Sequence, residues 1–183
     1  MTQAGQEVTR QYLDDIVTAE TLFEQQLRGF SKSGDDEEVQ VIMAEYAEAT
    51  RQQRERLAIR IADIGDRILS RKGGLASILK YPPQLLRGGS IVEEQTLQNL
   101  LVAYTIEAGE LAMYEALTTL AHAAGDTETE QLAKEIQSEK HNAAERIWHL
   151  LPSRSKIAFN MLTVSEIDPA VETKMADDRL MES

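Results

Sequence analysis

Three glutamates, Glu20, Glu110 and Glu139, occupy positions of predicted helices where the spacing calls for apolar side chains. Residues i, i+3, i+4 and i+7 of a helix share one face. The three faces read Ile16, Glu20, Phe23 and Leu27; Ile106, Glu110, Met113 and Leu117; and Leu132, Ile136, Glu139 and Ile147. A carboxylate on a buried face must be paired, bind a metal ion or take up a proton. What these glutamates contact in the core is therefore the functional question.

The composition limits the chemistry that this chain can support. A chain of 183 residues is long enough for one domain with a substantial core. It has no cysteine, so any metal would be bound through oxygen or histidine ligands. The net charge of −12, from 31 acidic and 19 basic residues, disfavours nucleic acid and anionic membrane surfaces as partners.

Neither a targeting signal nor a membrane span is expected. The first residues lack the basic and apolar regions of a signal peptide. The longest apolar runs, such as residues 100–104, are far too short to cross a bilayer. We therefore expect a soluble, cytoplasmic protein without a membrane partner.

The hydrophobic periodicity predicts four helices and no strand, at about residues 9–30, 37–69, 92–124 and 127–151. Gly34 is a plausible left-handed terminator of the first helix, and Asp35 and Asp36 can cap the second. Pro152 is expected to end the fourth helix. We predict one domain over residues 1–151 and a C-terminal extension over 152–183, which has room for a short helix on the bundle or on a second subunit.

The connections between these helices predict the topology. The turns at 31–34 and 124–126 are short, so each joins two antiparallel helices. The link at 70–90 contains paired glycines and prolines and one short helical stretch at 75–81. Its length is unusual for neighbouring antiparallel helices but suits a crossover along the bundle. The expected fold is an all-α, ferritin-like four-helix bundle of two antiparallel hairpins.

An internal repeat supports this arrangement. When the sequence is shifted by 90 positions, Ile16 aligns with Ile106, Glu20 with Glu110, and Leu27 with Leu117. Two copies related by a pseudo-two-fold axis would bring Glu20 and Glu110 together at the centre of the bundle.

Carboxylates that converge in a four-helix bundle are typical of di-iron and di-manganese centres. Such a centre takes one glutamate from each of two helices and a Glu-x-x-His pair from each of the other two. Glu20 and Glu110 match the single glutamates, and Glu107 lies one helical turn before Glu110. Glu139 matches the first position of a pair, but Asn142 stands where histidine is needed.

The second helix matches this pattern less well. Ala49 and Gln52 stand at the positions that correspond to the pair by the repeat. Glu48 is a neighbouring carboxylate that can compensate, and His141 stands next to Asn142. The metal-ligand set is therefore incomplete by spacing alone.

Several short motifs resemble the YciE/YciF-type stress-associated ferritin-like proteins over about residues 9–151. They are residues 12–16 with 19–20, residues 48–51 leading to 55–57, Glu107 and Glu110 with Tyr114, and Glu139 with Lys140. The resemblance implies a four-helix bundle, frequent dimerisation and a di-metal centre without a settled reaction. That family carries a further glutamate beside Glu48, where this chain has Ala49.

Two functional hypotheses follow. The first is a ferritin-like protein that binds iron or manganese through Glu20, Glu107, Glu110, Glu139 and Glu48, with a weak oxidase or peroxide-handling activity and a role in stress. The alternative is a metal-free bundle that acts as an interaction or assembly module. A homodimer or higher homo-oligomer is expected in either case. A purely structural oligomer is a third option, with an apolar face made by Leu85, Leu86, Ile157 and Met161. No catalytic residue is assigned.

Overall fold

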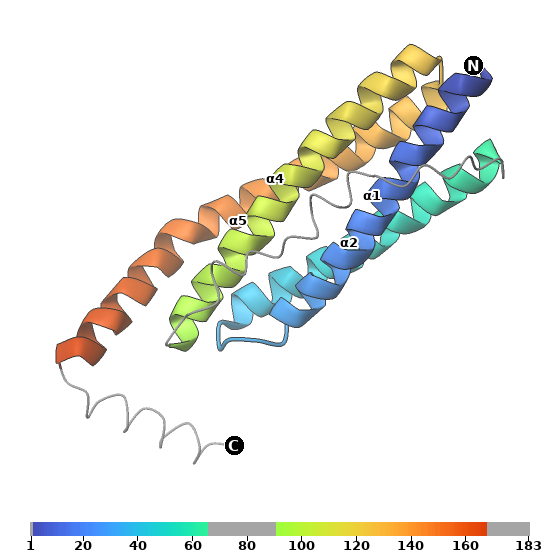
Figure 1. Ribbon diagram of the computed structural model, residues 1–183. Helices are drawn as coiled ribbons and strands as arrows, with labels where there is room; N and C mark the ends of the chain where they lie inside the picture. The colour runs from blue at the N-terminus through green and yellow to red at the C-terminus, as the bar shows by residue number, and fades with distance from the viewer. Residues whose placement is uncertain (1, 66–90, 168–183) are drawn as a thin grey trace.

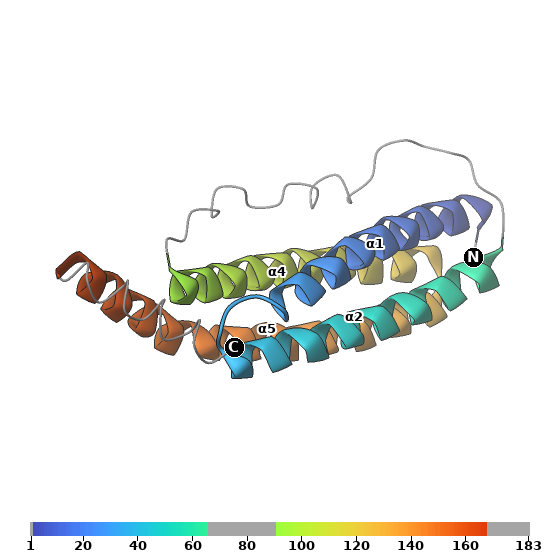
Figure 2. The same ribbon diagram turned by 90° about the horizontal axis from the view of Figure 1, so that it is seen from below.

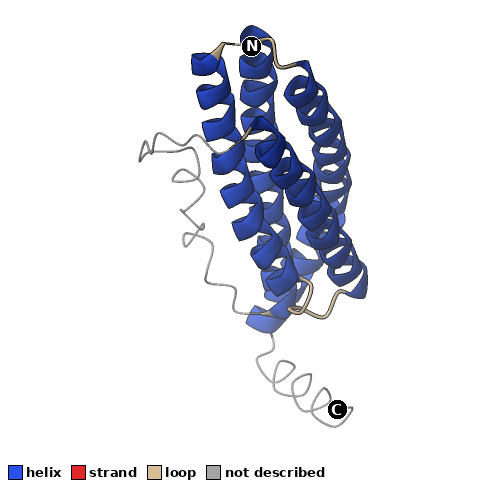
Figure 3. Ribbon diagram, turned by 90° about the vertical axis from the view of Figure 1, so that its right-hand side faces the viewer, coloured by secondary structure: helices blue, strands red, loops and turns tan. Residues whose placement is uncertain are grey.

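The computed structural model describes residues 2–65 and 91–167, which form four helices without a strand. They are α1 (Gln3–Phe30), α2 (Glu37–Ile64), α4 (Val92–Ala124) and α5 (Thr127–Ile167). Helices α1 and α2 pack as one antiparallel hairpin and α4 and α5 as another, and α1 also packs on α4 (Figure 1). The chain is therefore an all-α four-helix bundle, and Figure 3 shows its helices running along one common axis.

The short turns form where local residues specify them. Gly34 has a φ of +83° and Gly125 a φ of +71°, which glycine adopts without strain. The Asp36 side chain caps α2 by accepting a hydrogen bond from the Val39 N–H at 3.1 Å. The prediction that Asp36 caps the second helix is thus confirmed, whereas α1 ends at Phe30 with Ser31 as its C-cap, and Gly34 provides the left-handed residue of the following turn rather than the helix terminator.

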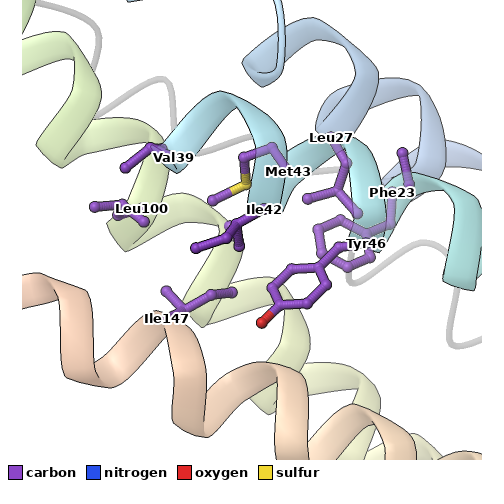
Figure 4. Packing of buried hydrophobic residues seen from close by; sticks show 10 residues of the cluster. Phe23, Leu27, Val39, Ile42, Met43, Tyr46, Leu100 and Ile147 are labelled. Atoms are coloured by element: carbon purple, nitrogen blue, oxygen red, sulfur yellow. The ribbon is translucent and has the colours of Figure 1, made fainter. Parts of the chain in front are cut away.

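The apolar core consists of two clusters along the bundle. One lies towards the turn between α1 and α2 and includes Phe23, Met43, Tyr46 and Ile147 (Figure 4). The other lies towards the opposite end. Its members are Leu13, Ile16, Ala19, Leu57, Met113, Tyr114, Leu117, Ala133 and Ile136. Burial of these side chains supplies most of the driving force for folding.

Two predicted helix ends differ from the structure. Helix α1 begins at Gln3 rather than near residue 9, because the Thr2 hydroxyl caps it by accepting from the Gly5 N–H at 3.2 Å. Helix α2 is described to Ile64, and its predicted end at 69 lies outside the described residues. The predicted crossover at 70–90 and the short helix at 75–81 also lie outside them.

The prediction that Pro152 ends the fourth helix is wrong, because α5 continues through it to Ile167. Proline removes one helical hydrogen bond and usually bends a helix, and Figure 2 shows the C-terminal part of α5 leaning away from the bundle. Contacts outside the helix hold this part in place. Arg154 donates to Asp36 at 2.8 Å and to Glu38 at 2.5 Å, and Ala158 is buried. The extension predicted at 152–183 therefore begins as a continuation of α5.

Asp126 stabilises the start of α5 at the other end of the bundle. Its carboxylate accepts from the Thr129 N–H at 3.0 Å and from Arg60 at 2.6 Å, and it is buried. Replacing Asp126 by alanine is expected to lower the free energy of unfolding by about 2–3 kcal/mol, because the cap and a mostly buried ion pair are both lost. Urea denaturation measures this change. Glu128→Ala is the control, since the exposed Glu128 also pairs with Arg60 but should cost less than about 1 kcal/mol; equal losses would contradict the prediction.

Candidate functional site: a buried lysine among three glutamates

Between the two apolar clusters lies a buried group of charged side chains from three helices. The Lys140 ammonium, on α5, lies 2.6 Å from Glu110 Oε2 and 3.0 Å from Glu20 Oε2. It lies 3.8 Å from Glu107 Oε2, beyond hydrogen-bond length. No residue of this group is more than 1% exposed. The site thus consists of three carboxylates around one ammonium group.

Two aromatic side chains complete the surroundings of the ammonium and its partners. The Tyr114 hydroxyl donates to Glu20 Oε1 at 2.6 Å, so both oxygens of Glu20 have a donor. Lys140 Nζ also lies 5.1 Å from the centroid of the Phe23 ring, within the range of a cation–π interaction.

The electrostatics of the group favour a charged lysine and raise the pKa of two of the glutamates. Burial alone would lower the pKa of Lys140, but Glu107, Glu110 and Glu20 more than offset it, so the pKa is raised. Burial raises the pKa of Glu107 to about 7, and the nearby Glu20 acts in the same direction while Lys140 opposes it. Burial, followed by the charge of Glu20, raises the pKa of Glu110 well above its ordinary value.

The structure brings three of the five predicted metal ligands together and leaves two outside. Glu20, Glu107 and Glu110 meet around Lys140. The expectation that Glu139 lies on the buried face is wrong. Its side chain is 45% exposed and accepts hydrogen bonds from Arg56 at 2.5 Å and from Gln53 at 3.0 Å.

Glu48 is likewise remote from the buried group. It lies on the surface beside Arg51, whose guanidinium donates to it at 2.6 Å and 3.0 Å. Arg51 lowers the pKa of Glu48 to about 2. Arg28 lies 3.9 Å away on the neighbouring helix, so Glu48 belongs to an exposed ion-pair network.

Sequence reasoning did not find the role of Lys140. The buried face of α5 consists of Ala133, Ile136, Lys140, Ala144 and Ile147, one position away from the predicted face at Leu132 and Glu139. The two alanines on this face, Ala133 and Ala144, could have indicated which side of α5 packs on its neighbours, because small side chains let helices approach closely.

A cavity of about 370 Å³ opens between α2 and α5 and reaches the buried group. Glu107 of α4 and Lys140 of α5 form part of its lining. Gln53 and Thr50 of α2 form another part. Glu139, Asn142 and Arg146 line it from α5, so the polar end of the predicted Glu139–Asn142 pair contacts this cavity rather than the core.

These residues do not fit a di-metal centre. Within residues 2–65 and 91–167, no group of three or more histidine, aspartate or glutamate side chains is arranged to hold a metal ion. The three buried carboxylates surround an ammonium group instead. A divalent ion about 4 Å from that ammonium would be repelled by about 8 kcal/mol at an effective dielectric constant of about 20. Loss of the lysine charge would be needed first, and its raised pKa opposes that loss.

The fold and the buried carboxylates define the class: this chain is an all-α four-helix bundle with a buried lysine among three glutamates at its centre. A family model described as "Domain of unknown function (DUF892)" matches residues 6–159, and the chain belongs to that family. The resemblance to the YciE/YciF-type proteins is thereby confirmed.

Solved structures support the same fold. The Escherichia coli stress protein YciF is 19% identical, with a TM-score of 0.72 over 85% of this chain and 99% of that one. A protein from Xanthomonas campestris pv. campestris is 17% identical, with a TM-score of 0.71 over 87% of this chain and 99% of that one. A comparison with curated proteins finds no match. In the described part of the chain, no helix is long and apolar enough to cross a membrane.

Proposed function

We propose that this chain is a metal-independent helical module that acts through association with other chains, including copies of itself. The observation that carries the proposal is the ammonium of Lys140, which lies among Glu20, Glu107 and Glu110 where a bundle of this class would need its cation. A covalently attached cation offsets part of the charge of the carboxylates without supplying redox or Lewis-acid chemistry. The site then serves the stability of the bundle.

Exposed apolar side chains on α5 support the role in association. Trp148 is 56% exposed and packs on Tyr104 of α4, with ring centroids 5.3 Å apart. Ile157, Phe159 and Val164 are exposed on the part of α5 beyond Pro152. Ile157 was part of the apolar face predicted for a structural oligomer; its predicted partners Leu85 and Leu86 lie outside the described residues. Exposed aromatic side chains such as Trp148 and Phe159 are enriched at protein–protein interfaces relative to the rest of the surface.

The relationship to the E. coli stress protein YciF supports a role under stress. A homodimer is the simplest assembly for one chain, because closed two-fold symmetry is the commonest arrangement of homo-oligomers.

Metal analysis and sizing of the same preparation test the proposal. Protein purified without chelator and loaded with Fe²⁺ or Mn²⁺ is expected to retain far less than one ion per chain after desalting. Light scattering is expected to give an oligomer, and Trp148→Ser with Phe159→Ser to shift it towards the monomer. Stoichiometric metal binding through the glutamates would overturn the metal-independent role. A protein that stays monomeric at all concentrations and binds no other chain would overturn the association role.

A further inference from the structure

Helices α2 and α5 face each other across a seam that polar side chains bridge along its length. Among the neighbouring helix pairs of the described bundle, these two pack least closely. The cavity of about 370 Å³ lies in the middle of this seam and reaches Glu107 and Lys140, each of which is 1% exposed. The links across the seam therefore decide whether the buried group meets solvent.

An ion pair that is largely shielded from water closes each end of the seam. At one end, Arg60 of α2 lies 2.6 Å from Asp126, and their side chains are 12% and 2% exposed. At the other end, Arg154 of α5 lies 2.8 Å from Asp36, and their side chains are 15% and 20% exposed. Salt screens buried or partly buried pairs much less than exposed ones. We call these two pairs the end clamps.

The ion pairs in the middle of the seam are exposed. Arg56 of α2 lies 2.5 Å from Glu139 of α5. Arg146 of α5 lies 3.3 Å from Glu45 of α2. Each of these side chains is between 36% and 55% exposed. Exposed ion pairs contribute little to stability and weaken further in salt, so the middle of the seam is held more weakly than its ends.

The links in the middle of the seam also surround the cavity. The guanidinium carbon of Arg146 lies 5.4 Å from the centroid of the Tyr46 ring. The Tyr46 hydroxyl donates to the backbone carbonyl of Ala143 at 3.2 Å, and Gln53 donates to Glu139 at 3.0 Å. All five of these residues line the cavity, whereas the residues of the end clamps do not. Separation of the middle links would thus widen the cavity without opening the ends of the seam.

We propose that the middle of the α2–α5 seam is a salt-sensitive gate. Arg56 and Arg146 separate from their partners on the opposite helix, the end clamps stay closed, and small solutes then reach the buried Lys140 group through the cavity. This device couples the ionic surroundings of the protein to the accessibility of its centre while the four helices stay folded. It goes beyond the proposed association and does not depend on it.

Because the chain has no cysteine, a single engineered thiol can report this opening. Thr50→Cys places the thiol on a residue that is 2% exposed and lines the cavity. Thr9→Cys is the control on α1. Thr9 is 0% exposed and stands one turn after Gly5, which lies against Ala124 of α4. The control thiol therefore reports the α1–α4 side of the bundle.

Both thiols are labelled with N-ethylmaleimide, an uncharged reagent, at about 10 mM and about 1 M KCl, between which the Debye length falls from about 30 Å to about 3 Å. The labelling rate of Thr50→Cys is expected to rise about threefold or more with salt, and that of Thr9→Cys to change by less than about 1.5-fold. Equal increases would show unfolding of the whole bundle and overturn the proposal, as would a salt-independent rate for Thr50→Cys. If Thr50→Cys does not fold, Ala143→Cys in the same lining takes its place.

Charge variants separate opening from a change in thiol chemistry. In the Thr50→Cys protein, Arg56→Gln with Arg146→Gln is expected to raise the labelling rate about threefold or more at low salt and to remove most of its salt dependence. Loss of two positive charges raises the pKa of a nearby thiol and slows its reaction, so a faster rate reports opening. Arg51→Gln is the matched control, because Arg51 pairs with carboxylates of its own helix. An unchanged rate in the double variant, or an equal rise with Arg51→Gln, would refute the gate.

Discussion

Replacing Lys140 by methionine is expected to lower the free energy of unfolding by about 3–5 kcal/mol at pH 8. The methionine side chain keeps the approximate length and the apolar stem of lysine, so the main change is loss of the ammonium group. Three carboxylates on α1 and α4 then lie close together without a cation. Protonation limits the cost, so the loss should be smaller at pH 5 than at pH 8. Urea denaturation at both pH values measures it.

The same site also permits a gain-of-function test. Lys140→Ala removes the ammonium and leaves space among Glu20, Glu107 and Glu110 for an ion with oxygen ligands. Mn²⁺ is expected to restore about 2–3 kcal/mol of stability to this variant at about 100 times its dissociation constant, and to leave the wild-type protein unchanged.

The control for both variants lies on the same helix. Lys134 is exposed and pairs with Glu130, so Lys134→Met and Lys134→Ala should change the stability by less than about 1 kcal/mol. A Lys140→Met variant as stable as the wild type would contradict the view that the ammonium holds the glutamates together. Equal Mn²⁺ stabilisation of both wild type and variant would show that the ion binds elsewhere.

The helices and their turns could be predicted because their signals are local. Gly34 and Asp36 specify the connection between α1 and α2 through backbone conformation and one side-chain hydrogen bond. The convergence of Glu20 and Glu110 was also predictable, because the repeat places them at matching positions of helices that pack together.

The phase of α5 could not be fixed in the same way. Ile136 and Ile147 belong both to the predicted face of α5 and to the buried face in the structure. The prediction placed Glu139 with them, whereas the structure buries Lys140. On the basis of one helix alone, either charged residue is costly to bury. Lys140 becomes favourable only because the neighbouring helices present carboxylates to it, and this is a property of the packed bundle.

The continuation of α5 past Pro152 has a similar explanation. Proline usually ends a helix, and its local cost is about 3 kcal/mol. The contacts of Arg154 with Asp36 and Glu38, together with the burial of Ala158, offset part of this cost. Asp36 was predicted from sequence as a cap, but its ion pair joins residues that are far apart in the chain.

The raised pKa of Glu107 gives the bundle a pH-dependent stability with a definite sign. Folding raises this pKa from 4.5 to about 7, so the folded protein holds a proton that the unfolded chain loses. The resulting stability is fully present below pH 4.5 and is lost as the pH rises through about 7. Glu110 has the same sign, because its pKa is also raised.

The variant Glu107→Gln isolates this contribution, because glutamine resembles the protonated acid. At pH 5 the variant and the wild type should be similarly stable, whereas at pH 8 the variant should be more stable by about 2–3 kcal/mol. Urea denaturation across this pH range measures both proteins, and Glu115→Gln controls for the loss of one exposed negative charge. Parallel pH profiles for Glu107→Gln and the wild type would show that Glu107 has an ordinary pKa. The burial of Glu107 beside Glu20 would then have to be balanced by Lys140 alone.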